Sequence, residues 1–323
     1  MDGEKTLQLL ELSDKPDGHV DMTFPTQATA PSRRTNQLND LTGKEWIQYT
    51  KSVWFQRGLG IRHPDAQIER LHPAPFSFQD VSRLIRFFTK SSGCVLDPFC
   101  GVASTLKACV FTQRLGTGIE LVPEWFEAGK ERLRKEVPEE LADWASKQTL
   151  ILGDTREIIP TFAPEIFNFV VTSPPYWGIL NKLPDHKVSS ERIGNGLATR
   201  YSTDKRDLAN IESYDEFLNE VCGVFRQCQR VMRPGAYMCV IVGDFRHGGK
   251  YIAYHADLIS KLSGPDLVLH GIVILVQNSK KLYPYGYPYA FVPNVHHQNI
   301  LIFRKPPTNS STNGRNLDAE QSP

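Results

Sequence analysis

The sequence predicts an α/β fold, with a mainly parallel, seven-stranded sheet and helices on both faces. Two observations predict it. Between residues 41 and 305, short apolar segments alternate with longer segments whose apolar residues recur at helical spacing, which is the pattern of strands joined by crossover helices. The composition, 40% hydrophobic and 23% charged over 323 residues, is that of a globular chain long enough to bury a sizeable core.

The predicted strands are short apolar runs, each closed by a turn or by the start of a helix. They cover residues 94–97, 115–121, 149–154, 167–172, 236–244, 266–277 and 298–305. Helices are predicted from about residue 103, over 124–136 directly after Pro123, over 213–232 and over 251–262. The third helix has an apolar face and ends at the Pro-Gly turn of residues 234–235.

Other segments flank or interrupt this pattern. Residues 1–40 are polar and aperiodic, so we expect a flexible N-terminal segment, and residues 306–323 have the composition of a disordered tail. The domain is therefore expected to span residues 41–305. Within it, residues 178–212 follow neither period, and loops of this length are usually functional or disordered. We treat them as an insertion and as a candidate recognition region.

Charge, cysteine and hydropathy patterns restrict the class of protein. The formal net charge is +1, which announces no nucleic-acid partner, although a neutral protein can still concentrate basic residues on one face. The six cysteines form no Cys-x-x-Cys pair, and we expect no metal site. The first residues lack a signal-peptide pattern, and no apolar run reaches the roughly 20 residues that span a bilayer. We therefore expect a cytoplasmic protein with no membrane partner.

The first chemical motif, VLDPFCGVAST, follows the strand at 94–97. Asp97 ends the strand, Phe99 follows, and Gly101 permits a tight turn that passes a ligand close to the backbone. In an open parallel sheet, ligands bind at the carboxyl ends of the strands. The motif lacks the GxxxxGK[ST] pattern of a phosphate loop. A purely structural strand-to-helix turn is the alternative.

Acidic residues stand at the ends of the next two strands. Glu120 can accept both hydroxyl protons of a ribose, and Asp154, in GDTRE, can accept from an adenine amine. Each has a structural alternative, because an acid at this position also caps the helix that follows. An acid at the tip of three successive strands suits a neutral adenosine ligand better than a polyphosphate.

The sequence TSPPYWG, residues 172–178, contains two consecutive prolines, which end a strand because neither has an N–H to donate. Ser173 and the carbonyl of Pro174 can accept from one exocyclic amine, and Pro174 and Pro175 stiffen the loop. Holding both amine hydrogens out of the ring plane frees the nitrogen lone pair for attack. Tyr176 can stack on a flat base. The alternative is a plain loop-forming Pro-Pro.

With these motifs in this order, the chain resembles the DNA amino-methyltransferases over roughly residues 70–305. DPFCG is similar to the family's DPFxG loop, SPPY to its catalytic tetrapeptide, and HPAPFSFQDVSRLI to the segment before the cofactor loop. The loop departs from the usual DPFxGSGT at Val102 and Ala103, so the carry-over stops at Gly101. The resemblance implies a Rossmann-like methyltransferase fold and S-adenosyl-L-methionine bound by Asp97, Phe99, Gly101, Glu120 and Asp154, with Phe76 or Phe78 nearby.

The serine of SPPY is similar to that of the cytosine-N4 enzymes, whereas aspartate is commoner among the adenine-N6 enzymes. The resemblance thus implies a site-specific enzyme that flips cytosine out of duplex DNA and methylates N4 by direct in-line transfer. Adenine-N6 methylation is the main alternative, followed by an RNA or protein-amide methyltransferase and by a non-catalytic binding module. The chain has no Pro-Cys, which argues against cytosine-C5 chemistry. A cognate restriction endonuclease acting separately is one implied partner, beside double-stranded DNA.

Candidate DNA-binding residues occur in the insertion and in an aromatic stretch near the end of the chain. They are Lys182, Lys187, Arg192, Arg200, Lys205 and Arg206 in the insertion, and Tyr283 and Tyr285 in NSKKLYPYGYPYAFVPNVHH. A solvated loop of mixed charge and a rigid Pro-Tyr surface loop are the respective alternatives. The stretch 44–62, with basic and aromatic residues interleaved, is either a further DNA contact or an amphipathic helix on the core.

Overall fold

The computed structural model describes residues 35–56, 63, 68–69, 72, 77–178, 202–277, 280 and 282–308. Two compact units divide the chain, Met1–Thr35 and Asn36–Pro323, and the elements given below belong to the second. The expectations for residues 1–34, for residues 309–323 and for most of the insertion, 179–201, lie outside the described residues.

Strands and helices alternate along the second unit. The strands are β1 (Val53–Phe55), β2 (Cys94–Asp97), β3 (Leu115–Glu120), β4 (Thr149–Leu152), β5 (Phe167–Thr172), β6 (Met232–Val242), β7 (Phe245–His247), β8 (Lys250–Ile252), β9 (Val268–Val276) and β10 (His297–Arg304). The α-helices are α1 (Gly43–Tyr49), α2 (Phe78–Phe88), α3 (Ser104–Thr112), α4 (Pro123–Lys135), α5 (Ala142–Ser146), α6 (Thr155–Ile158), α8 (Tyr214–Val231) and α9 (Tyr254–Leu262). Short 3-10 turns are η3 (Glu139–Leu141), η4 (Ile159–Thr161) and η5 (Leu208–Asn210).

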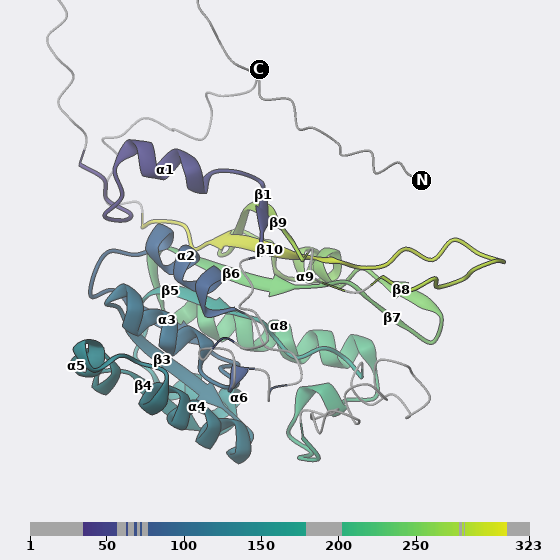
Figure 1. Cartoon of the computed structure of the whole chain (residues 1–323), viewed down its shortest axis with the longest axis horizontal. Coiled ribbons are helices and arrows are strands. Elements are labelled where there is room, and N and C mark those ends of the chain that lie inside the picture. Colours follow the sequence, from purple (N-terminus) through teal and green to yellow (C-terminus); the bar gives the residue numbers. More distant parts are fainter. Residues whose placement is uncertain are drawn as a thin grey trace, which may run out of the picture. The chain divides into compact units, whose positions relative to one another are not determined.

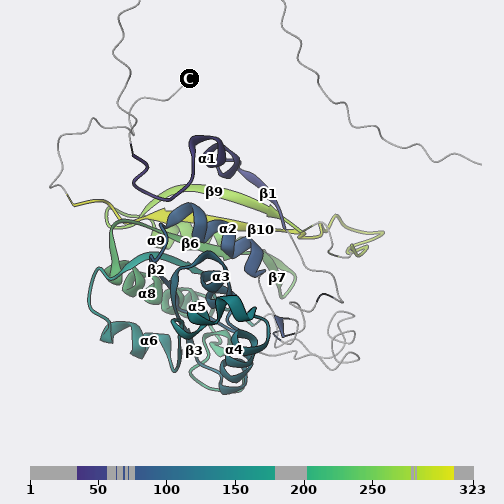
Figure 2. The ribbon, with the colours of Figure 1, turned by 60° about the vertical axis from the view of Figure 1, so that its left-hand side comes forward.

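Eight strands form one sheet in the order β1-β9-β10-β6-β5-β2-β3-β4 (Figure 1). Neighbours pair in parallel except around β10, which is antiparallel to both β9 and β6. The mainly parallel α/β fold is confirmed, but the predicted count of seven strands was one too few. Figure 2 shows the additional strand, β1, beside β9. Three residues are too few to show a period in the sequence, and β1 and α1 together account for part of the stretch 44–62.

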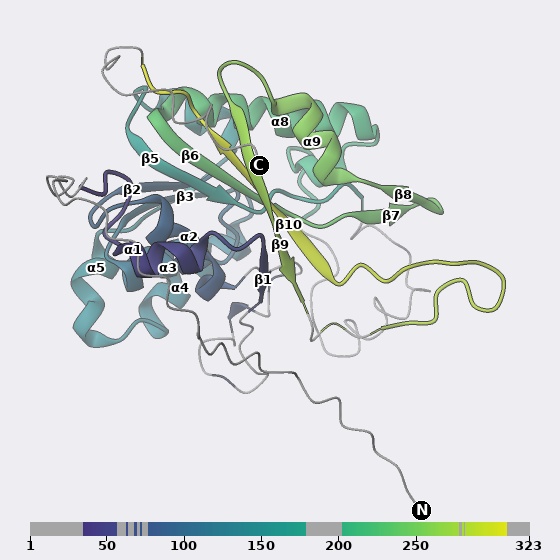
Figure 3. The same cartoon turned by 90° about the horizontal axis from the view of Figure 1, so that it is seen from above.

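The sheet is covered on both faces, because its central strands alternate buried side chains between two cores. On β6, Met238, Val240 and Val242 pack with α8 and α9, while Cys239 and Ile241 pack with α2 and α3. Figure 3 shows α8 and α9 on one face and α2 and α3 on the other. Side chains that alternate between two cores along an apolar run, residues 238–242, are what a strand buried on both faces requires.

Several boundaries differ from the prediction. β6 begins at Met232 and continues past Pro234 and Gly235, with a register shift against β5 that absorbs the turn residues. The hairpin β7–β8 takes the start of the predicted helix 251–262, so α9 begins at Tyr254. Residues 36–40 contact the domain, since Asp40 accepts from the backbone N–H of Ser91 at 2.7 Å.

The carboxyl ends of β2, β3, β4 and β5 lie at one edge of the sheet. The parallel register places Asp97 opposite Gly118, and Glu120 opposite Leu152. Gly118 needs to be glycine, because a Cβ there would lie 2.3 Å from the Cys100 sulfur in the loop after β2. None of the helices in the described ranges is both long and apolar enough to cross a bilayer.

Candidate active site

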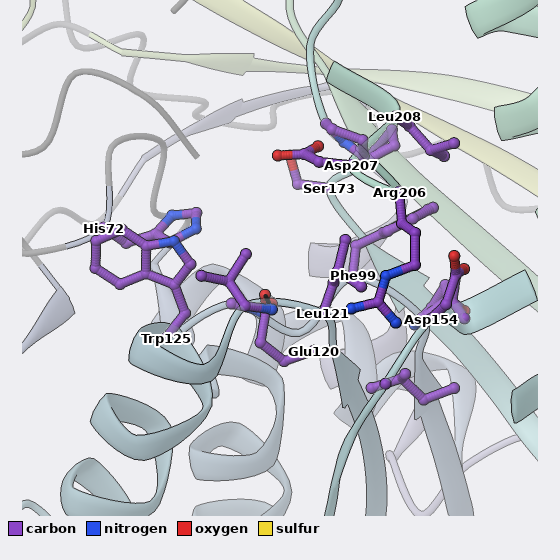
Figure 4. A pocket seen from close by; sticks show the side chains of 18 residues that line it. His72, Phe99, Glu120, Leu121, Trp125, Asp154, Ser173, Arg206, Asp207 and Leu208 are labelled. Carbon is purple, nitrogen blue, oxygen red and sulfur yellow. Dashed lines mark hydrogen bonds between the residues drawn. The ribbon is translucent and has the colours of Figure 1, made fainter. Parts of the chain in front are cut away.

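A pocket opens at this carboxyl edge, and Figure 4 shows its side chains converging from separate parts of the chain. It holds about 690 Å³ of space, its open mouth included, within the roughly 300–1,000 Å³ usual for small-molecule sites. Residues 202–210, here called the covering segment, complete its wall. The lining residues include His72, Phe99, Gly101, Glu120, Leu121, Val122, Trp125, Asp154, Thr155, Ser173, Pro174, Pro175, Arg206, Asp207 and Leu208.

Asp97 is fully buried behind this lining. Its Oδ1 accepts from the Thr172 hydroxyl at 2.6 Å and from the backbone N–H of Phe99 at 3.1 Å, and its Oδ2 accepts from the Thr105 hydroxyl. Burial raises the pKa of Asp97 to about 6, against the effect of these hydrogen bonds. Asp97 thus joins β2, β5 and α3 and holds the loop that carries Phe99 and Gly101 at the pocket.

Glu120 faces the pocket from the end of β3. Its Oε2 accepts from the backbone N–H of Gly101 and its Oε1 from that of Val122, both at 2.8 Å. Gly101 adopts φ +53°, a left-handed conformation that favours glycine. Burial raises the pKa of Glu120 to about 7, and repulsion from Asp207 and Asp97 adds to it. Each carboxylate oxygen keeps a further lone pair that a ligand hydroxyl can use.

Asp154 caps α6, as its structural alternative predicted, and it also lines the pocket. Its Oδ1 accepts from the backbone N–H of Arg156 at 2.9 Å, and the Arg156 guanidinium holds both oxygens, the shorter contact being 2.7 Å. Arg156 also pairs with Glu220 at 3.0 Å. The charge of Asp154 is therefore balanced within the protein.

Ser173, Pro174 and Pro175 line the pocket directly after β5. The backbone of Pro175 is held from behind, where the Tyr254 hydroxyl donates to its carbonyl at 3.4 Å. The two prolines and this contact restrict the backbone that carries the Ser173 hydroxyl and the Pro174 carbonyl. Ser173 and Pro174 thus line the pocket from a restricted backbone, and each has an oxygen that can accept a hydrogen bond.

The next two side chains are anchored on neighbouring elements. The Tyr176 hydroxyl accepts from the backbone N–H of Gly243 at 2.8 Å, just after β6, and burial raises the pKa of Tyr176. The Trp177 indole donates to the Ile211 carbonyl at 2.9 Å, and its ring centroid lies 4.1 Å from that of His247 on β7. These contacts fix both ring planes beside the acceptors.

The covering segment brings two charged side chains to the pocket. Arg206 lines it while pairing with Asp204 at 2.7 Å, and Lys205 beside it is exposed. Asp207 is buried, and its oxygens accept from the Ser202 hydroxyl at 2.8 Å and from the backbone N–H of Ala209 at 2.9 Å. The structure therefore brings Arg206, a candidate for DNA binding by sequence, to the pocket wall.

Tyr283 and Tyr285 lie away from the pocket, in a projecting loop of residues 282–296 between β9 and β10 (Figures 1 and 3), here called the aromatic arm. Their ring centroids are 5.6 Å apart. The Asn294 side chain closes the base of the arm, accepting from the Tyr283 N–H at 2.9 Å and donating to the Tyr283 carbonyl at 2.8 Å. At the tip, Tyr289 and Phe291 are 94% and 91% exposed.

Comparison with known proteins assigns the chain to a family. A family model described as DNA methylase matches residues 10–131 and 167–323, which is most of the chain. The chain belongs to the DNA methylase family. The family that the motifs of residues 97–101 and 173–176 predicted is thereby confirmed.

Individual relatives of this DNA methylase match shorter parts of the chain. The type II methyltransferase M.SmaI of Serratia marcescens is 26% identical over 102 residues, which are 31% of this chain and 28% of that protein. The methylase candidate YubD of Escherichia coli K12 is 39% identical over 64 residues, 20% of this chain and 28% of that protein. The matches thus span about 28% of these curated relatives. A DNA modification methylase candidate from Thermus thermophilus, solved with S-adenosyl-L-methionine, is 26% identical with a TM-score of 0.32, over 48% of this chain and 51% of that chain.

The resemblance described above implies S-adenosyl-L-methionine as the cofactor, and the Thermus thermophilus structure holds that molecule. The residues of the pocket suit it. Glu120 has lone pairs that hydroxyl groups of a ligand can use, and Leu121, Val122 and Trp125 give the pocket an apolar wall on which a flat ring can pack. Among the described residues, no three His, Cys, Asp or Glu side chains gather into a metal site.

Some candidate residues lie in parts of the chain that the structure does not describe. Phe76, Lys182, Lys187, Arg192 and Arg200 fall outside the described residues. The structure adds Trp125 and Asp207 to the pocket. Trp125 occupies the first turn of the helix after Glu120, so its position just beyond a predicted strand end could have identified it from the sequence. Asp207 lies in an aperiodic segment, and only tertiary packing brings it to the sheet edge.

Proposed function

We propose that this DNA methylase transfers the methyl group of S-adenosyl-L-methionine to the N4 amine of cytosine in duplex DNA. The observation that carries the proposal is the position of Ser173 and Pro174 in the lining of the cofactor pocket, at the end of β5. The bound cofactor supplies an activated methyl group on a sulfonium. The chain's own residues have to orient an amine at that group and exclude other nucleophiles.

Ser173 and Pro174 supply the orientation. An aromatic amine is a weak nucleophile because its lone pair is delocalised into the ring. The Ser173 hydroxyl and the Pro174 carbonyl accept its two hydrogens and hold them out of the ring plane, which localises the lone pair on nitrogen. Because the acceptors are fixed before the substrate arrives, no reorganisation is needed as charge develops.

Tyr176 acts as the platform for the base. Its hydroxyl contact to Gly243 sets the ring plane beside the acceptors, and stacking on an aromatic face is favourable for any base. The target amine is unreachable while its base is stacked and paired, so the base has to leave the duplex. The serine at position 173 favours cytosine N4 over adenine N6.

The aromatic arm and the covering segment supply candidate DNA contacts. No Asp or Glu occurs between Asp266 and Lys305, so the arm carries no charge that repels phosphate. Its exposed rings, including Tyr285 and Tyr287, suit contact with bases. Lys205 is exposed beside the pocket and is positioned for a backbone phosphate.

The test is transfer of an isotope-labelled methyl group to unmethylated duplex DNA by the full chain and by Ser173→Ala. We expect the unaltered protein to label DNA and the variant to lose at least about 100-fold in rate, the scale of losing one preorganised hydrogen-bonding group, with unchanged cofactor binding. Ser146→Ala, an exposed serine on α5 outside the pocket lining, serves as the matched control and should retain labelling. A Ser173→Ala protein with full activity would contradict the proposal.

A further inference from the structure

Asp207 is a buried carboxylate in the pocket wall whose charge no described residue balances. It is 6% exposed, and its partners are neutral donors, the Ser202 hydroxyl and the backbone N–H of Ala209. Burial raises the pKa of Asp207. Because an ionised buried carboxylate without a cation is costly, a positive ligand beside Asp207 would be favoured.

Each of the other acids of the site is either paired with a cation or placed away from the end of the pocket that holds Ser173. Asp154 is held by the Arg156 guanidinium at 2.7 Å, and Asp204 by Arg206 at 2.7 Å. Asp97 is enclosed behind the lining by two threonine hydroxyls. Glu120 has backbone N–H partners only, but it stands at the end of β3, where the ribose hydroxyls are assigned.

Asp207 lies at the end of the pocket where the methyl group has to be delivered. It shares the lining with Ser173 and Pro174, and Figure 4 shows the side chains of Asp207 and Ser173 at the same end of the pocket. The amine held by Ser173 and Pro174 has to lie in direct contact with the methyl group that it attacks. The positive sulfur that carries this methyl group is therefore brought towards Asp207.

We propose that Asp207 recognises the sulfonium charge of the cofactor and so lets the site discriminate S-adenosyl-L-methionine from S-adenosylhomocysteine, the demethylated product. This inference rests on the proposed function. The two molecules carry the same ammonium and carboxylate groups and differ in the methyl group and its sulfonium charge. The carboxylate of Asp207 attracts the charged form, and after transfer that attraction is gone, which favours release of the product.

A structural role for Asp207 gives a different expectation. Asp207 also caps the short turn η5, and loss of that cap would disturb the covering segment and weaken both molecules alike. Asparagine caps about as well as aspartate but carries no charge. Asp207→Asn therefore separates the charge from the cap.

The experiment is calorimetric titration of the full chain, of Asp207→Asn and of Asp215→Asn with each of the two molecules. Asp215 is an exposed acid on α8 outside the pocket and serves as the matched charge control. We expect Asp207→Asn to weaken S-adenosyl-L-methionine by about tenfold and S-adenosylhomocysteine by less than about twofold, with the control unchanged for both. If Asp207→Asn is poorly folded in thermal melting, Asp207→Ser is measured instead, because serine also caps.

Each other outcome overturns the inference. Equal weakening of both molecules would assign Asp207 to the cap or to the shared ammonium group, and no change would remove it from recognition. Failure of the unaltered protein to bind S-adenosyl-L-methionine at all would overturn the proposed function together with this inference, whereas tight binding with an unchanged ratio in the variant would overturn the inference alone.

Discussion

The change Glu120→Gln is expected to remove a pH dependence from both folding and ligand binding. Glu120 is 8% exposed, and its pKa is about 7 against an ordinary 4.5. At about 1.36 kcal/mol for each pH unit, keeping the ionised form in the folded protein costs roughly 3 kcal/mol. Because the pKa of Glu120 is higher in the folded protein than in the unfolded chain, protonated Glu120 contributes to the free energy of unfolding. This contribution is fully present below the pKa of the unfolded chain and is lost as the pH rises through about 7.

Binding follows the opposite trend. The ionised carboxylate of Glu120 can accept a hydrogen bond from both ribose hydroxyls, whereas the protonated form has given one of these positions to its own proton. The affinity for an adenosine ligand should therefore fall about tenfold for each pH unit below about 7. The assay is calorimetric titration with 5′-methylthioadenosine, which stays neutral between about pH 5.5 and about pH 8.5, so that only the protein titrates. Glu120→Gln should bind weakly and equally across this range.

The matched control is Glu127→Gln, an exposed acid of α4 that pairs with Lys130, and it should behave as the unaltered protein does. Urea titrations at the two ends of the pH range measure the stability side. An affinity that is flat with pH in the unaltered protein would refute the assignment of Glu120 to the ribose. So would a Glu120→Gln variant that keeps the same pH profile.

Three further changes test other parts of the structure. Tyr176→Phe leaves the backbone N–H of Gly243 without its acceptor, so urea titration should show a loss of about 1–2 kcal/mol in the free energy of unfolding. Methyl transfer should be slower and cofactor affinity unchanged. Unchanged stability would contradict a stabilising role for this hydrogen bond. Phe291→Ser should weaken duplex DNA binding about tenfold in fluorescence anisotropy and leave stability within about 0.5 kcal/mol; unaltered DNA affinity would remove the tip from the interface. Glu136→Gln deprives the fully buried Lys107 and Arg132 of their shared carboxylate and should cost about 3 kcal/mol in urea titration; a loss under about 1 kcal/mol would contradict this estimate.

The sequence sufficed for the parallel part of the sheet and for the lining contributed by its strand ends. Long apolar runs such as residues 167–172 signal burial on both faces, and the residue after such a run has to emerge at the carboxyl edge. Glu120 and Ser173 were therefore placed at the pocket from position alone. The edge strand β1 was missed because a three-residue strand carries no periodicity, and its pairing with β9 is decided by tertiary contact.

Side-chain partners were beyond the sequence. Asp97 was predicted to face the cofactor, but hydrogen bonds from Thr105 and Thr172 hold it behind the lining. Arg206 was expected at DNA and lies in the pocket wall. Each outcome depends on how distant segments pack, which single-residue properties do not encode.

Position 103 combines a backbone conformation and a distant contact that the sequence alone did not reveal. Ala103 replaces the glycine usual in the DPFxGSGT loop, which is why the carry-over from the family stopped at Gly101. It adopts φ +61°, a left-handed conformation that is costly for alanine. Gly129 on α4 makes room for the Ala103 methyl group, because a Cβ at position 129 would lie 3.1 Å from the Cβ of Ala103. The contact between these two positions becomes evident only from the packing of the start of α3 against α4.

The most direct test of the central claim is nucleoside mass spectrometry of unmethylated duplex DNA incubated with the full chain and S-adenosyl-L-methionine, beside the Ser173→Ala variant. The account predicts N4-methylcytosine from the unaltered protein and at least about 100-fold less from the variant. N6-methyladenine as the product would contradict the cytosine assignment while leaving the amine chemistry in place. DNA with neither modified base would contradict the proposed function and direct the search to RNA or protein amides.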